Sequence, residues 1–121
     1  MNIKQIEDAL KNEDASPPDL AQFSTILAGY YSYYGQMLKR IQLRKPQAWL
    51  QIQDYELETD GPVVPKREKP LSDKKTERMW EATKDGQAEI ALEWELKRIE
   101  KMMQAINKRL YVDSVASKNQ Y

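Results

Sequence analysis

The chain has 121 residues, the usual size of one domain, and is 40% hydrophobic and 31% charged, with a mean hydropathy of −0.82. Its 19 basic and 19 acidic residues cancel, which excludes a strong overall attraction to nucleic acid or to an anionic membrane. The lack of cysteine excludes disulfides and thiolate metal sites and fits a reducing cytoplasm. We therefore expect a single domain spanning residues 1–121.

No basic segment is followed by an apolar run, and no apolar stretch reaches the roughly 18 residues that a membrane-spanning helix needs. We predict a protein that is neither exported nor inserted in a membrane, and so a cytoplasmic one.

A short helix is predicted within residues 1–15. Asn2 can cap its first turn and Gln5 can complete a capping box. Ile3, Ile6 and Leu10 give this helix one apolar side.

A long helix is predicted over residues 16–53. Ser16 is its expected cap, followed by Pro17 in the first helical position and Asp19 in the first turn. Pro46 removes an amide donor, so we expect a kink or a break there. Apolar residues along this helix alternate at spacings of three and four, which is typical of a seam against another helix. They are Leu20, Phe23, Leu27, Tyr30, Tyr34, Met37 and Ile41.

Residues 54–71 form the predicted linker, in which Gly61, Pro62, Pro65 and Pro70 act as helix breakers. Four acids alternate at its start, where carboxylates could bind a hard cation, but the loop lacks the glycine and final acid of an EF-hand. They are Asp54, Glu56, Glu58 and Asp60. We interpret them as a solvated acidic connector and expect no metal site.

Ser72 is predicted to cap a short helix over residues 72–84, in which Met79 and Trp80 face inward. Asp85-Gly86 is the expected break before a C-terminal helix over residues 87–116. That helix carries a second seam, which we assign to oligomerisation. Its residues are Leu92, Leu96, Ile99, Met103, Ile106 and Leu110.

These elements predict an all-α fold in which two long amphipathic helices form a hairpin with short flanking helices. One helix pair has few ways to bury both seams together with Trp49, Trp80, Trp94 and Met102. We therefore predict a homo-oligomer.

Catalysis has little basis in the sequence. Histidine and cysteine are absent, which removes the commonest general base and a common nucleophile. Neither phosphate-binding glycine motif occurs. We predict that the chain is not an enzyme and uses no cofactor.

Tyr30, Tyr31, Tyr33 and Tyr34 form a dense aromatic cluster. They could be a platform on which single-stranded bases stack, or core and interface residues whose hydroxyls reach the rim. Helical spacing favours the second interpretation for Tyr30 and Tyr34, whereas Tyr31 and Tyr33 lie off the seam.

Two basic clusters could contact phosphates, because an oligomer would repeat them around a groove. The alternative is a solvated helix face. The first comprises Lys39, Arg40, Arg44 and Lys45, and the second comprises Lys97, Arg98, Lys101, Lys108 and Arg109. Charge also differs along the chain: residues 1–65 carry six basic and nine acidic side chains, and residues 66–121 carry 13 and 10.

The order of these features resembles the UvsY-type recombination mediators of tailed phages. A long helix leads through Arg40-Ile41 and Lys45 to Asp54-Tyr55, a glycine-containing linker follows, and an amphipathic helix carries Ala105-Ile106 and Arg109. The likeness covers the layout of residues 20–115.

The resemblance implies a small all-helical protein that assembles as a ring through its C-terminal helix. It also implies binding of single-stranded DNA and loading of a recombinase in exchange for the single-strand-binding protein, inside a bacterial host. In the family, basic residues precede the Asp-Tyr pair, whereas this chain has Trp49-Leu50-Gln51-Ile52-Gln53. Either the DNA function is lost and only the scaffold remains, or the contacts shift to Arg44, Lys45, Lys66, Arg67 and Lys69.

The predicted nucleic-acid-binding residues are Lys39, Arg40, Arg44, Lys45, Lys66, Arg67, Tyr31 and Tyr33. The leading hypothesis is a non-catalytic accessory protein that binds single-stranded DNA and promotes recombinase loading. The alternative is a protein-interaction module without DNA binding, such as a virion-assembly chaperone or an inhibitor of a host defence complex. The neutral charge and the acidic segment after residue 53 suit this alternative.

Overall fold

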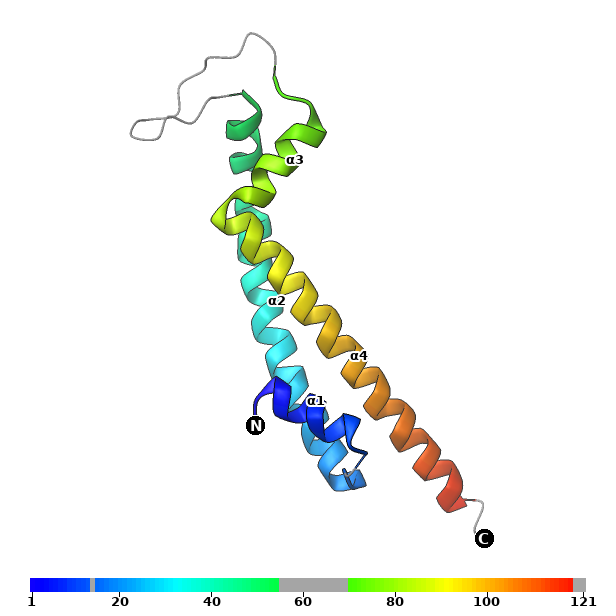
Figure 1. The fold of residues 1–121 in the computed structure, drawn as a ribbon. Helices are drawn as coiled ribbons and strands as arrows, with labels where there is room; N and C mark the ends of the chain where they lie inside the picture. The colour runs from blue at the N-terminus through cyan, green and yellow to red at the C-terminus, as the bar shows by residue number, and fades with distance from the viewer. Residues whose placement is uncertain (14, 55–69, 119–121) are drawn as a thin grey trace. The chain divides into compact units, whose positions relative to one another are not determined.

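The structure is a computed structural model that describes residues 1–13, 15–54 and 70–118, with side chains described as far as residue 112. Its described part contains the helices α1 (Ile3–Lys11), α2 (Pro17–Asp54), α3 (Asp73–Ala82) and α4 (Lys84–Lys118), and no strand (Figure 1). The predicted all-α class is confirmed. Residues 55–69, which include Lys66, Arg67 and most of the predicted linker, lie outside the described residues.

The helix caps form where the sequence places them. Asn2 and Gln5 make the reciprocal hydrogen bonds of a capping box at the start of α1. Ser16 and Asp19 exchange the same pair of bonds at the start of α2. Ser72 accepts a bond from the amide of Lys75 at the start of α3. Each cap pairs amides that the first helical turn leaves without partners.

The chain divides into two compact units, and α2 and α4 each contribute to both. Unit 1 comprises Met1–Gly35 and Trp94–Tyr121, and unit 2 comprises Gln36–Glu93. α2 continues through Pro46 as one helix, so the chain does not break there. The units are described separately below.

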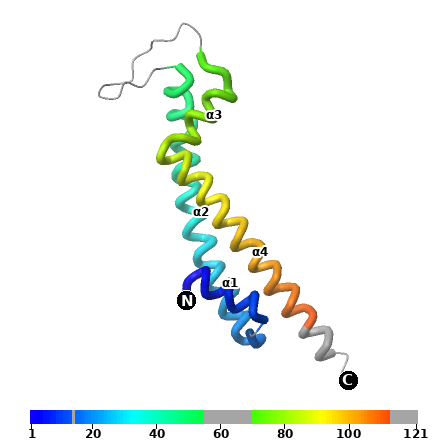
Figure 2. Tube along the Cα trace, viewed as in Figure 1, coloured from blue at the N-terminus to red at the C-terminus, as the bar shows by residue number. Residues whose placement is uncertain are grey.

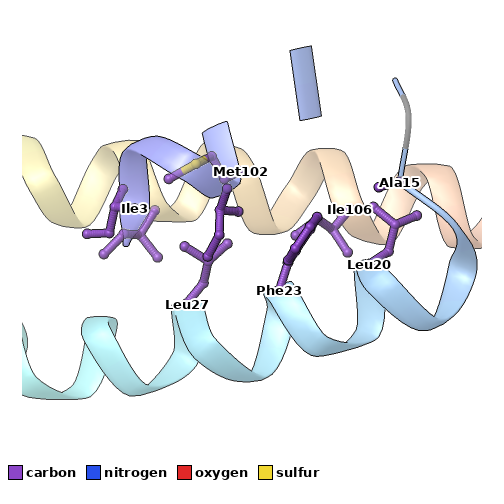
Figure 3. Close-up of a cluster of buried hydrophobic side chains, with 9 residues drawn as sticks. Ile3, Ala15, Leu20, Phe23, Leu27, Met102 and Ile106 are labelled. Atoms are coloured by element: carbon purple, nitrogen blue, oxygen red, sulfur yellow. The ribbon is translucent and has the colours of Figure 1, made fainter. Parts of the chain in front are cut away.

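In unit 1, the first half of α2 packs antiparallel against α4 (Figure 3), and α1 lies across them (Figure 1). Leu20, Leu27, Ile99 and Ile106 are completely buried in this core. Packed with them are Ile3, Ile6, Ala15, Phe23 and Met102. The two predicted seams therefore meet each other inside one chain.

This packing changes the assignment of the C-terminal seam. Ile99 and Ile106 have no exposed surface, because both pack inside the unit 1 core. Met103 and Leu110 pack against the same core while half-buried, and Leu96 is also half-buried. The seam is the intramolecular core, because the two helices already satisfy each other's apolar stripes.

In unit 2, α3 and the first turns of α4 follow one another beside the second half of α2, and the chain turns between them (Figure 2). The core of this unit is small. Its buried residues are Leu38, Ile41, Ile52, Thr76, Trp80, Glu89 and Leu92. Met37, which was predicted to lie in the seam, is 36% exposed, and the neighbouring Leu38 is buried instead. The seam spacing after Tyr34 is therefore four and then three, which follows the helical period.

The joint between α3 and α4 lies at Thr83, two residues before the predicted break. Thr83 is extended (φ −74°, ψ 161°), and its hydroxyl accepts a hydrogen bond from the amide of Gly86 at 3.0 Å. This side chain caps α4, and so Asp85 and Gly86 belong to the first turn of that helix. Met79 is 39% exposed and does not face inward as predicted.

Candidate functional site

The first basic cluster is largely occupied within unit 2. Arg44 forms a two-point interaction with Asp85, with N–O distances of 3.3 and 3.2 Å. The Lys45 ammonium lies 3.0 Å from Glu89 Oε1 and 3.7 Å from Glu77. It also lies over two indole rings, 5.8 Å from the centroid of Trp49 and 5.5 Å from that of Trp80.

These contacts set the chemistry of Lys45. Burial lowers the pKa of its ammonium, but the hydrogen bond to Glu89 and the charges of Glu89, Glu77 and Glu93 outweigh that effect and raise the pKa above its ordinary value. Lys45 is thus a half-buried charge whose partners belong to its own unit, so we leave it and Arg44 out of the binding surface proposed below. Lys39 and Arg40 are exposed and have no partner among the described residues.

The tyrosine cluster has mixed surroundings in unit 1. Tyr30 and Tyr34 are half-buried and stack with ring centroids 6.0 Å apart. Tyr31 donates its hydroxyl proton to Glu100 at 2.8 Å, and this bond raises the pKa of the phenol. Tyr33 is 60% exposed. Of the two tyrosines predicted to stack on bases, Tyr33 is the more accessible.

The second basic cluster forms an exposed row on α4. We call Trp94, Lys97, Lys101 and Lys108 the basic face, because spacings of three, four and seven place them on one side of the helix. Trp94 is 70% exposed, and the Lys97 ammonium lies 6.0 Å from the centroid of its ring. Lys101 and Lys108 are exposed and have no ion-pair or hydrogen-bond partner among the described side chains.

The two arginines of this cluster face α1 and its loop. Arg98 donates to Glu7 at 2.7 Å, and this hydrogen bond raises the pKa of Arg98 and lowers that of Glu7. Arg109 donates to the carbonyl of Glu13 at 2.9 Å. These arginines fix the N-terminal segment on α4, which leaves the lysines as the free cations of the cluster.

A shallow groove runs beside the basic face, between α1 and α4. Hollows of about 490 and 330 Å³ adjoin each other there, because both are lined by Leu10 and Ala105. The residues that line this α1–α4 groove are Glu7, Leu10, Lys11, Glu13, Arg98, Lys101, Met102, Ala105, Lys108, Arg109 and Val112. Its floor is apolar, its rim carries three lysines, and Lys101 and Lys108 belong to the basic face as well.

The sequence predicts that oligomerisation helps to bury Trp94, and within this one chain its side chain is 70% exposed. A usable signal was present, because residue 94 lies midway between Leu92 and Leu96 and therefore on the side of the helix away from the seam. The described residues contain no group of carboxylates placed to hold a metal ion. None of the described helices is long and apolar enough to cross a membrane.

Comparison with known protein families, with curated proteins and with solved structures finds no match to this chain.

Proposed function

We propose that the chain is a non-catalytic accessory protein that binds single-stranded DNA and promotes recombinase loading in recombination or replication. The observation that supports DNA binding is the basic face, where the exposed indole of Trp94 adjoins three lysines in a row. Flat aromatic rings stack on unpaired bases, and lysines beside them neutralise phosphates. The face offers both contacts on one helix.

The geometry favours a single strand over a duplex. In a duplex the bases are already stacked and paired, so an indole on a convex helix surface meets only the sugar-phosphate backbone. Lys97 and Lys108 lie roughly 16 Å apart along the helix axis, a length over which several phosphates of one strand can be contacted. The exposed Tyr33, Lys39 and Arg40 remain candidates for further contacts, as the sequence predicted.

Loading of a recombinase, and exchange with a single-strand-binding protein, are proposed from the resemblance to UvsY-type mediators. That resemblance also implies assembly of several copies. Because the C-terminal seam is used inside unit 1, association would have to use other exposed apolar residues. Leu43 and Leu50, one heptad apart on α2, are 72% and 55% exposed.

DNA binding is tested by the fluorescence anisotropy of labelled single-stranded and duplex oligonucleotides at two salt concentrations. We expect tight binding of the single strand that weakens steeply with salt. Replacing both Lys101 and Lys108 with Glu should weaken it at least tenfold and reduce the salt dependence. The matched control replaces Lys74 and Arg78, which are exposed on α3, with Glu.

Trp94→Ala separates stacking from charge. Loss of the indole should weaken binding of the single strand by about 1–3 kcal/mol without changing the salt slope. If the wild-type protein and the Lys101→Glu/Lys108→Glu variant bind the single strand with equal affinity, the basic face is not the DNA-binding surface. Absence of any binding at low salt would refute DNA binding altogether.

A protein-interaction module without DNA binding is the second candidate, and two observations favour it. Arg44 and Lys45 are paired with carboxylates of their own unit, and Leu43 and Leu50 expose an apolar strip on another side of α2. Such a module could act as a virion-assembly chaperone or as an inhibitor of a host defence complex. The anisotropy titration with labelled DNA distinguishes the candidates, since only the first function requires DNA binding. Affinity capture with wild-type protein and with Leu43→Lys/Leu50→Lys then tests whether the strip binds a protein partner.

A further inference from the structure

We infer that the α1–α4 groove is a docking site for an acidic amphipathic helix of another protein. The groove has a floor formed by Leu10, Met102 and Ala105 and a rim formed by Lys11, Lys101 and Lys108. A helix with one apolar side and flanking carboxylates matches both features. Docking of such a helix does not depend on the proposed DNA function.

The floor exposes apolar atoms mainly at Leu10 and Ala105. Met102 is buried and forms part of the unit 1 core, whereas Ala105 is exposed and half-buried Leu10 borders both hollows. The small side chain of Ala105 lets another backbone approach α4 closely. Helices bind grooves of this kind through residues at spacings of three, four and seven.

Charge complementarity selects an acidic occupant. The three rim lysines are exposed, and Lys11 has only a long ion pair with Glu7, at 3.7 Å, among the described residues. Glu7 itself is held by Arg98, whose Nε lies 2.7 Å from its carboxylate. Glu13 is the second carboxylate in the lining, so five basic side chains face two acidic ones. This excess of positive charge would be neutralised by a helix bearing Glu or Asp on its flanks.

The described surface of this chain does not offer a helix of that kind to a second copy. The apolar stripes of α1, α2 and α4 are buried in their own units. Leu43, the first residue of the exposed pair, lies one helical turn from Lys39 and Arg40, which have no partner among the described residues and which the lysine rim would repel. An occupant from a different protein fits the observations better.

The docking site overlaps the basic face at Lys101 and Lys108. If the proposed DNA function holds, a docked acidic helix and a bound single strand exclude each other, and the partner would displace DNA by mass action. This consequence rests on the proposed function, whereas docking itself can be measured without DNA.

The probe is a labelled synthetic peptide of about four helical turns, with Leu on one side and Glu on the flanks. Its control contains the same residues in an order that spreads Leu around the helix. Anisotropy with the full chain should show the patterned peptide binding at least tenfold more tightly than the shuffled one. Equal binding would mean ionic attraction alone and would overturn the inference.

The groove is tested by filling it. Ala105→Phe places a large side chain on the floor and should weaken binding of the patterned peptide at least tenfold. Gln104→Phe, the same change at the neighbouring exposed residue, should leave it unchanged. Circular dichroism checks that both variants keep their helix content. Unchanged peptide binding by a folded Ala105→Phe protein would overturn the inference.

Measurements of DNA displacement and of self-association distinguish helix docking from the proposed DNA function and from contact with a second copy. A patterned peptide that displaces labelled DNA from the wild-type protein supports docking at the shared lysines. Peptide binding with no DNA binding refutes the proposed function alone, and DNA binding without peptide binding refutes this inference alone. Self-association that Ala105→Phe abolishes, with no peptide binding, would assign the groove to a second copy instead.

Discussion

Trp80 donates its indole N–H to Oε1 of Glu89 across 3.2 Å, and both side chains are buried. The same oxygen accepts a hydrogen bond from the ammonium of Lys45 at 3.0 Å. One carboxylate oxygen therefore satisfies a buried indole and a half-buried cation that come from two different helices, α3 and α2. This shared acceptor connects α2, α3 and α4 within unit 2.

Glu89→Leu should destabilise unit 2. The change leaves the Trp80 N–H and the Lys45 ammonium without their shared acceptor, and a buried pair that loses one partner costs several kcal/mol. Lys45 keeps partial exposure and its second partner, Glu77, so we expect a loss of about 2 kcal/mol in the free energy of unfolding. Urea titration followed by tryptophan fluorescence measures this change.

Glu77→Leu is the matched control, because Glu77 is more exposed and lies 3.7 Å from the same ammonium. It should cost less than about 1 kcal/mol. Adding Lys45→Met to Glu89→Leu should restore part of the lost stability, since no uncompensated charge remains. Equal effects of Glu77→Leu and Glu89→Leu would contradict the central role of Glu89.

Alkaline pH should weaken unit 2 through Lys45. The pKa of this ammonium is raised in the folded state above its ordinary value of 10.5. A raised pKa means that the folded protein holds the proton more tightly, so the stabilisation is complete below the unfolded pKa and is lost as the pH rises through the folded pKa. We expect the stability difference between the wild-type protein and Lys45→Met to be smaller at a pH above 10.5 than at about pH 8.

The stability difference is measured from the urea unfolding midpoints of the wild-type protein and of Lys45→Met at the lower and at the higher pH. Other lysines and tyrosines titrate in the same range, and comparison with Lys45→Met cancels their contribution. A constant difference between the two proteins at both pH values would contradict the raised pKa.

The helices could be predicted because their signals are local. Caps at Asn2, Ser16 and Ser72 are short-range hydrogen bonds, and alternation of three and four residues identifies a buried stripe whatever it packs against. The partner of a stripe is a long-range property. Ile99 and Ile106 would look the same in an oligomer interface as in an intramolecular core, and only the structure places them opposite α2.

The site could be predicted less well, because charge in the sequence does not reveal pairing in space. Arg44 and Lys45 read as a basic cluster, yet their partners Asp85 and Glu89 follow about 40 residues later, beyond the reach of any local pattern. In the basic cluster on α4, Arg98 and Arg109 bind the acceptors that α1 and its loop offer. Lys101 and Lys108 are left without an ion-pair partner among the described side chains.

Gly86→Ala should destabilise the joint between α3 and α4. A Cβ at this position would lie 1.9 Å from the carbonyl oxygen of Trp80 and 2.9 Å from the Cα of Glu81. Both are backbone atoms, so the two helices would have to separate, which costs about 1–3 kcal/mol. The thermal midpoint should fall, because the close approach of α3 to α4 requires a residue without a side chain.

Gly29→Ala and Gly35→Ala are the matched controls, since both glycines lie inside α2 and an added Cβ meets nothing within 4 Å. Each should raise the free energy of unfolding by up to about 1 kcal/mol, the helix propensity difference between Gly and Ala. A Gly86→Ala protein that gains as much stability as the two controls would show that α3 does not approach α4 this closely.

Ile99→Asp should unfold unit 1 even if the protein is a monomer, because Ile99 lies in the core of this unit. The side chain is completely buried among Phe23, Leu27 and their neighbours, where a carboxylate has neither water nor a cation to stabilise it. We expect a loss of at least about 3 kcal/mol and a fall in helix content that is independent of protein concentration. Trp94→Asp, on the exposed side of the same helix, should change stability by less than about 1 kcal/mol. Circular dichroism and native mass at two concentrations distinguish the cases, because a variant that keeps its helix content but changes its native mass would return Ile99 to an interface between copies.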